Sequence, residues 1–347
     1  MTEHAPANVT AARKPVSTDS ALRIIIVLLV ASVLGLGGLL GYTVWQGDRA
    51  ERTATPAARA IRSLETVVKK SPNSAAARVR LGEALAAAGS LDAATEQFST
   101  AIRLDKNHTG AYLDLGILAM QDKNYGPAEK YFDKVVELTQ GTQFEAMNAR
   151  REQALFHLGE IALDQKRFDD ATGYFKGALR IRKDASDTYY LLAVSLRGMD
   201  EDAAALKQLE AAIAFDPNYP EAHYLWGVIL LEQGDRINAA THLRKSVDLA
   251  PEQKQPAEAL KKLGSADDAL EQGRAQLADG KSQAALDSAL LATVLEPDNS
   301  EATLFYVDVL MKRGEKAVAV KTLTQAIKDA PADKDLKARL TVVNASK

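Results

Sequence analysis

A residue pattern that returns every 34 positions constrains the fold of this chain more than any other feature of its sequence. Alanine occupies one place in every copy: Ala94, Ala128, Ala171, Ala205, Ala239, Ala285 and Ala319. A fixed period of this length is the signature of a repeat architecture, in which each unit buries its apolar face only against a neighbour. The sequence therefore predicts a stack of similar units, with insertions where the interval is longer.

Each unit reads as a pair of antiparallel helices. The units start at Ala75, Thr109, Glu152, Ser186, Pro220, Ala266 and Ser300. The eighth residue is small in six of them: Gly82, Gly116, Gly159, Ala193, Gly227 and Gly273, with Val307 in the seventh. Small residues allow two helices to approach closely, while large apolar residues at i, i+3, i+4 and i+7 form a buried stripe. A turn of the type Gly-Ser or Lys-Asn separates the two helices.

The length and offsets of this pattern resemble those of the tetratricopeptide repeat (TPR) family. The resemblance covers residues 57–347. It implies an all-α, right-handed superhelical α-solenoid of about seven helix pairs, with capping helices at its ends. Ahead of this solenoid we expect one transmembrane helix.

The breaks in the period predict how the chain is organised. Residues 143–151 add to the third unit and contain no Gly or Pro, so we expect them to lengthen the following helix. The predicted parts are a disordered tail (1–21), a transmembrane helix (22–46), a first section with a half-repeat and five units (57–253), an inserted linker helix (254–265), and a second section with two units and a capping helix (266–347).

The membrane prediction depends on an uncharged, mainly apolar run from Ile24 to Trp45. As a helix it would extend about 33 Å, enough to cross the hydrocarbon core of a bilayer. Arg23 precedes the run, and Tyr42 and Trp45 lie at its far end, where interfacial aromatic side chains are common. We interpret the run as a signal anchor. A cleaved signal peptide is the alternative, although the run is long for one and lacks a nearby small-x-small site.

The orientation and pairing of this helix stay open at the level of sequence. A short basic tail favours a cytoplasmic N-terminus with the repeats extracytoplasmic, whereas the arginines after the run favour the reverse. Gly37 and Gly41 form a G-x-x-x-G spacing that allows close helix contact, so a homo-oligomer is one expectation. The alternative is that glycine is simply common in membrane helices.

Composition and motifs point away from catalysis. The chain has no cysteine, which excludes disulfides and thiolate metal sites, and its formal net charge of −3 gives no reason to expect nucleic acid as a partner. None of the five histidines has metal-ligand spacing, and neither a P-loop nor a G-x-S-x-G motif occurs. We predict no enzyme, no cofactor and no metal site. His223 and His242 fall on the two helices of one unit, and we expect packing or surface roles for them.

The resemblance to TPR proteins implies a concave groove lined by the first helix of each unit. The candidate partner-binding residues are Val79, Leu113, Met120, Phe156, Tyr190, Tyr224, Leu270 and Leu304. An acidic edge is formed by Asp187, Glu221, Asp267 and Glu301. Such a surface would bind an amphipathic helix or an extended peptide with apolar anchors and some basic residues. The alternative is that these side chains pack between neighbouring first helices.

The sequence thus predicts a membrane-anchored scaffold that recruits or assembles envelope proteins through its groove. Two alternatives remain: the same solenoid as a regulatory or assembly platform facing the cytoplasm, or a self-assembling spacer without a groove for a partner.

Overall fold

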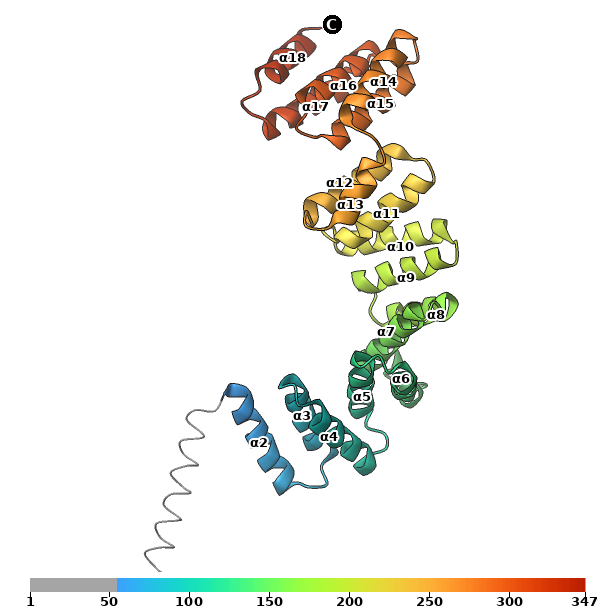
Figure 1. Ribbon diagram of the computed structural model, residues 1–347, viewed down its shortest axis with the longest axis vertical. Coiled ribbons are helices and arrows are strands. Elements are labelled where there is room, and N and C mark those ends of the chain that lie inside the picture. Colours follow the sequence, from blue (N-terminus) through green and yellow to red (C-terminus); the bar gives the residue numbers. More distant parts are fainter. Residues whose placement is uncertain (1–54, 347) are drawn as a thin grey trace, which may run out of the picture. The chain divides into compact units, whose positions relative to one another are not determined.

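The structure is a computed structural model that describes residues 55–346. All its regular elements are helices (Figure 1). Their bounds are α2 (Pro56–Lys70), α3 (Ala75–Ala87), α4 (Leu91–Leu104), α5 (Thr109–Gln121), α6 (Tyr125–Thr139), η1 (Glu145–Met147), α7 (Ala149–Asp164), α8 (Phe168–Ile181), α9 (Ser186–Gly198), α10 (Asp202–Phe215), α11 (Pro220–Glu232), α12 (Arg236–Leu249), α13 (Lys254–Lys261), α14 (Ala266–Ala278), α15 (Ser282–Leu295), α16 (Ser300–Lys312), α17 (Lys316–Asp329) and α18 (Lys334–Ala345). The helices form two compact parts, an N-terminal part from α2 to α4 and a C-terminal part from α5 to α18.

In the N-terminal part, α3 and α4 form a helix pair and α2 packs on α3. The interface between α3 and α4 contains Ala94, Phe98 and Ala101 of α4, which are fully buried or nearly so. Thr55 caps α2 through its side chain, and Pro56 follows at the first helical position, where its missing N–H is not needed.

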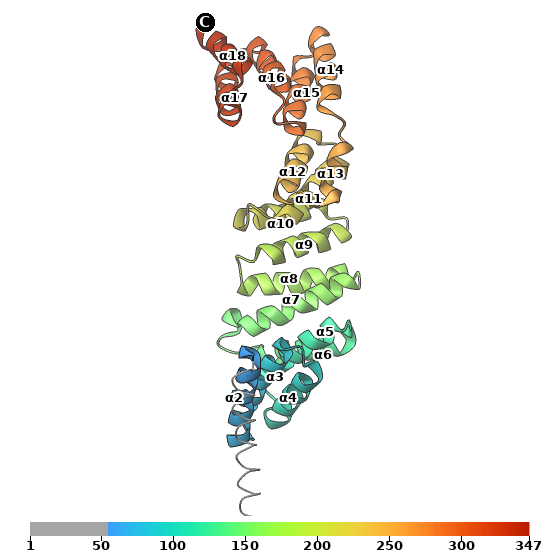
Figure 2. The ribbon, with the colours of Figure 1, turned by 60° about the vertical axis from the view of Figure 1, so that its left-hand side comes forward.

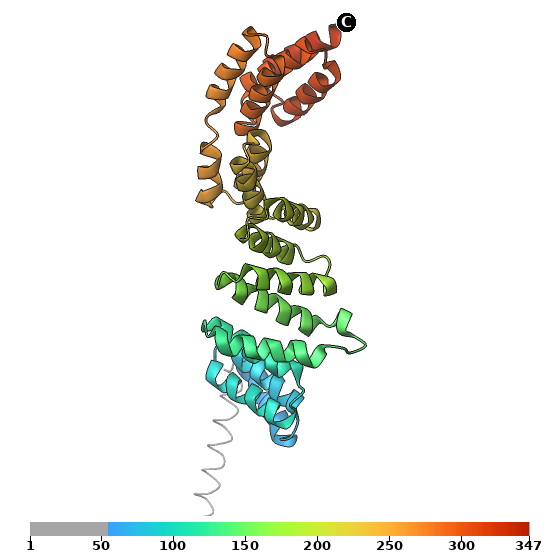
Figure 3. The ribbon, with the colours of Figure 1, turned by 90° about the vertical axis from the view of Figure 1, so that its right-hand side faces the viewer.

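In the C-terminal part, the helices pair as α5/α6, α7/α8, α9/α10, α11/α12, α14/α15 and α16/α17. Figure 2 shows α7, α8, α9 and α10 in successive layers, and the side view in Figure 3 shows the same stacking. The second helices α6, α8, α10 and α15 also pack against the next first helix, whereas α12 packs against α13 and α15. Each of α5, α7 and α9 contacts the following first helix directly. The first helices therefore share one side of the stack, here called the first-helix face. The prediction of an all-α fold built from antiparallel pairs is confirmed.

The small eighth residue makes room for a bulky side chain from the second helix of the same unit. A Cβ atom added at Gly159 would lie 2.6 Å from Cε1 of Phe175, whose side chain is completely buried. The pairs Gly82–Phe98 and Gly116–Phe132 have the same geometry. The fourth unit carries alanine at the eighth position, and its partner is the smaller Leu209. In these four units the two positions are thus matched in volume, as close packing requires.

The turn inside each pair contains one residue with a left-handed backbone, always at the fifteenth position. Four of these residues are glycines: Gly89, Gly234, Gly280 and Gly314. The other three are Lys123, Lys166 and Asp200, with φ angles of 55°, 59° and 61°. Side chains with a Cβ atom pay a steric penalty in this region, whereas glycine does not. The tight reversal predicted from the Gly- and Lys-containing turns is confirmed.

The two insertions differ in structure. Residues 141–148 form a loop with the short 3₁₀ helix η1, and α7 begins at Ala149. The prediction that the whole of 143–151 lengthens the next helix is therefore wrong for most of the segment, since only its last three residues join α7. Met147 at the end of η1 is largely exposed, so this segment buries too little apolar surface to favour a longer helix. In the second insertion, α13 spans Lys254–Lys261 and packs on α12.

The predicted tail (1–21), the predicted transmembrane helix (22–46), Gly37 and Gly41 lie outside the described residues. Within residues 55–346, no helix combines the length and the apolar character needed to cross a membrane.

Candidate functional site

The residues predicted to bind a partner divide into two groups by burial. Val79 of α3, Leu113 of α5 and Leu270 of α14 are buried, with exposed fractions of 6%, 6% and 3%. These three therefore serve mainly the packing between helices. The remaining candidates are half-buried: Met120, Phe156, Tyr190, Tyr224 and Leu304.

Phe156 of α7 faces the packed interior of its own unit. Its ring lies edge-on to the buried ring of Phe175, with centroids 6.0 Å apart, and the His157 ring lies 5.6 Å away. Although Phe156 precedes Tyr190 by one repeat, its ring contacts belong to its own pair of helices.

Tyr190 and Tyr224 belong to a cluster of three tyrosines on the first-helix face. Tyr219, directly before α11, places its ring 5.2 Å from that of Tyr190 at an interplanar angle of 51°. Burial raises the pKa of Tyr190, and the neighbouring Glu221 and Tyr224 raise it further. Tyr219 was not among the predicted partner-binding residues, because it lies just outside the first helix of its repeat. An aromatic residue immediately before a helix-starting proline was the available signal.

The environment of this cluster is acidic. Burial is the main cause that raises the pKa of Tyr219, and Tyr190, Glu221, Asp187 and Asp216 add to the effect. One oxygen of Glu221 accepts a hydrogen bond from the side-chain amide of Gln253, at 3.1 Å. Asp187 lies 3.4 Å from a guanidinium nitrogen of Arg182, which also pairs with Glu152. We refer to Tyr190, Tyr219, Tyr224 and Glu221 as the tyrosine–glutamate cluster.

A single ion pair lies at the other end of the same two helices. Nη2 of Arg197, on α9, is 2.7 Å from Oε1 of Glu232, on α11. The other terminal nitrogen, Nη1, is buried and has no hydrogen-bond partner. This pair links neighbouring first helices, so it fixes their spacing on the first-helix face.

His223 and His242 meet inside the fifth unit, with their Nδ1 atoms 3.1 Å apart. Nε2 of His223 lies 3.2 Å from the carbonyl oxygen of Pro217, which can only accept, so a neutral His223 receives its second hydrogen bond from Nδ1–H of His242. Trp226 stacks on His242 with ring centroids 4.3 Å apart. Burial lowers the pKa of both histidines, that of His242 to about 4. In the described part of the chain, no three His, Cys, Asp or Glu side chains group as metal ligands would.

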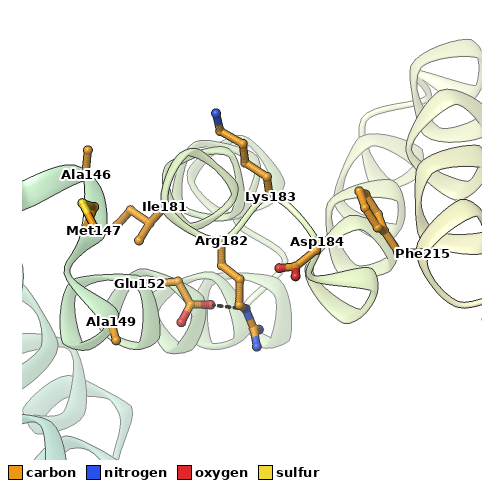
Figure 4. A pocket seen from close by; sticks show the side chains of 9 residues that line it. All are labelled: Ala146, Met147, Ala149, Glu152, Ile181, Arg182, Lys183, Asp184 and Phe215. Atoms are coloured by element: carbon orange, nitrogen blue, oxygen red, sulfur yellow. Dashed lines mark ion pairs between the residues drawn. The ribbon is translucent and has the colours of Figure 1, made fainter.

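Three further large apolar side chains are exposed near the segments that join successive repeats. Phe144 and Met147, in residues 141–148, and Phe215, the last residue of α10, expose 62%, 82% and 51% of their surface. Met147 and Phe215 line a pocket of about 610 Å³ together with Ile181. Figure 4 shows this pocket, with the Arg182–Glu152 ion pair among its lining residues. The exposure of Phe144 and Met147 was not predicted, because residues 143–151 were expected to be helical.

The chain is similar to proteins built from TPR units. A tetratricopeptide repeat profile matches residues 49–109, 142–187 and 257–334, which together make up more than half of the chain. Related TPR profiles match residues 109–142 and 200–234. A search of curated proteins gives no match.

Among solved structures, YrrB, "a TPR protein with an unusual peptide-binding site", is 20% identical with a TM-score of 0.50, and the match covers 58% of this chain and 100% of YrrB. A chain of the Cut9–Hcn1 hetero-tetramer is 23% identical with a TM-score of 0.48, over 60% of this chain and 40% of that chain. MamA from Desulfovibrio magneticus is 22% identical with a TM-score of 0.45, over 52% of this chain and 96% of that chain.

The YrrB match supports the fold, and the profile matches extend across both sections of the repeat region. The chain belongs to the tetratricopeptide repeat family, whose members are protein-interaction scaffolds and are typically not catalytic.

Proposed function

We propose that this protein is a membrane-anchored scaffold whose first-helix face binds a peptide or helical segment of partner proteins, and that it acts in the assembly of envelope proteins. The observation that carries the binding site is the group of half-buried tyrosines at Tyr190, Tyr219 and Tyr224, which come from two neighbouring units. Aromatic side chains dominate the energetics of protein interfaces, because they offer a large contact area at a small entropic cost. The peptide-binding site described for YrrB adds support from a protein of the same fold.

A crosslinking pull-down tests the binding site. In the variant Tyr190→Ala/Tyr224→Ala, we expect each partner captured by the wild type to be recovered at least about tenfold less, since interface hot spots contribute more than about 1 to 2 kcal/mol each. The matched control is Tyr131→Ala, which removes a half-buried tyrosine from α6, a second helix. Circular dichroism melts of all variants show whether the fold is retained. An unchanged set of partners in the folded double variant would refute recognition by this face and would favour the spacer alternative.

The membrane anchor is proposed from the sequence alone. Residues 22–46 would insert as one helix, with the tail in the cytoplasm and the repeats outside it. Because the chain has no cysteine, Ala345→Cys creates a single thiol at an exposed position near the end of α18. We expect a membrane-impermeant maleimide to label this thiol in intact spheroplasts. Labelling only after lysis would instead place the repeats in the cytoplasm, and release of the wild-type chain by carbonate washing would refute the anchor.

A further inference from the structure

We infer that the tyrosine–glutamate cluster is a subsite for one positively charged side chain, arginine or lysine, of the bound protein segment. This inference rests on the proposed function and specifies the chemistry of the same site. It goes further because it assigns the recognition of charge to four named residues.

The rings of the cluster meet the first requirement for binding a cation. Tyr190 and Tyr219 lie 5.2 Å apart and are tilted by 51°, so their faces are not closed against each other in a parallel stack. Tyr224 is the next first-helix tyrosine along the face and is close enough to influence the ionisation of Tyr190. The face of an aromatic ring attracts an ammonium or guanidinium group through its quadrupole, and the attraction grows as the site loses water.

The second requirement is negative charge that is not already neutralised. Glu221 forms no ion pair with any of the described residues, and the partner of its carboxylate is the neutral amide of Gln253. Asp187 is only partly neutralised, because Arg182 is shared between Asp187 and Glu152. After burial, the negative charges of Glu221 and Asp187 contribute to the raised pKa of Tyr219. An incoming cation would complete this charge balance.

The subsite is held by rigid elements. Tyr219 and Glu221 flank Pro220, the first residue of α11, whose ring fixes the local backbone. Gln253, which holds the Glu221 carboxylate, is the residue that precedes α13, so the inserted helix supports the site from outside the repeat pattern. Groups that are already oriented lose less freedom on binding, which favours affinity.

The surface beside the subsite defines the neighbouring residue of the partner. Val194 and Val228 are half-buried and follow Tyr190 and Tyr224 by four residues on the same helices. Residues four apart share a helix face, so apolar surface continues from the tyrosines along α9 and α11. The partner segment that fits carries arginine or lysine next to an apolar side chain.

The experiment is selection of binding peptides on the full-length protein in lipid nanodiscs, from a random library of 12-residue peptides. We expect the enriched peptides to carry arginine or lysine beside an apolar residue. For a synthetic copy of such a peptide, Glu221→Gln should weaken binding at least about tenfold, because it removes a charge-assisted contact. Tyr219→Leu should weaken binding about fivefold, whereas Tyr219→Phe keeps the ring and should change it less than about twofold.

Two controls isolate the effect of charge. Glu210→Gln makes the same substitution at an exposed position of α10, a second helix, and should leave binding unchanged. The synthetic peptide with its basic residue replaced by glutamine should bind wild-type and Glu221→Gln protein equally, with weaker dependence on salt.

The outcomes separate this inference from the proposed function. Peptides whose binding needs Tyr190 and Tyr224, but which show no preference for a basic residue or no effect of Glu221→Gln, would overturn the cation subsite and leave the peptide-binding face intact. Failure to enrich any peptide, or enrichment of peptides that bind the Tyr190→Ala/Tyr224→Ala variant unchanged, would overturn both.

Discussion

The close contact between Gly159 and Phe175 predicts that an alanine at Gly159 will destabilise the third unit. The added Cβ would lie 2.6 Å from Cε1 of Phe175, whereas ordinary contact at this kind of site begins at 3.4 Å. Phe175 is completely buried, so its ring has little room to move away. Overpacking costs about 1 to 3 kcal/mol, and because this ring is enclosed we expect the upper part of that range, about 2 to 3 kcal/mol. Alanine gains about 1 kcal/mol over glycine in a helix, so we expect a net loss of about 1 to 2 kcal/mol.

The fourth unit indicates how the loss can be repaired, because there Ala193 is paired with Leu209. Phe175→Leu alone should cost about 1 to 2 kcal/mol through the space it leaves. In the double variant Gly159→Ala/Phe175→Leu, the methyl group occupies that space and the clash is removed, so we expect a favourable coupling of about 2 to 3 kcal/mol between the two changes. Gly173→Ala, on α8 of the same helix pair, is the control. No neighbouring atom lies within 4 Å of the added Cβ, so this change should stabilise α8 slightly.

Amide hydrogen exchange in α7 and α8 is the appropriate assay, because repeat arrays open unit by unit and the change is local. Protection factors there should fall about 5- to 30-fold in Gly159→Ala and recover in the double variant. Unchanged or higher protection in Gly159→Ala would refute the reasoning, as would a double variant equal to the sum of the single variants.

Two further predictions concern the pH dependence and the turns. Burial lowers the pKa of His223 and of His242, the latter from 6.5 to about 4, so between these pH values the unfolded chain binds more protons than the folded chain. The free energy of unfolding should therefore fall as the pH falls from 6.5 to about 4. Urea unfolding followed by Trp226 fluorescence in a Trp45→Phe background measures this change. His242→Phe should flatten this dependence and His108→Gln should not; an equally steep dependence in His242→Phe would contradict the assignment. At the left-handed turn position, Lys166→Gly should stabilise the α7/α8 pair by about 1 kcal/mol, and Gly234→Ala should destabilise the α11/α12 pair by a similar amount, both measured by hydrogen exchange. A loss of protection in Lys166→Gly would show that backbone strain does not govern this turn.

Much of the fold could be read from the sequence, because the repeat pattern is a local signal with a direct steric meaning. The alanines from Ala94 to Ala319 at position twenty are all fully buried, as close helix contact requires. The turn residues were also predictable, since glycine and lysine recur at one position. The insertion at residues 143–151 was not, because the absence of Gly and Pro does not force a helix when the segment has little to pack against.

The period, the pairing of helices inside each repeat, and membership of the tetratricopeptide repeat family all follow from the amino-acid sequence, because they depend on residues at fixed separations along the chain. Which first-helix residues remain accessible depends instead on how the helices pack in three dimensions. This packing buries Val79, Leu113 and Leu270, turns Phe156 toward Phe175, and brings Tyr219 and Gln253, from outside the first helices, to Tyr190 and Glu221. The physical reason is that burial and charge at each position depend on the neighbouring unit, and the separation between units in space is not encoded in any single repeat.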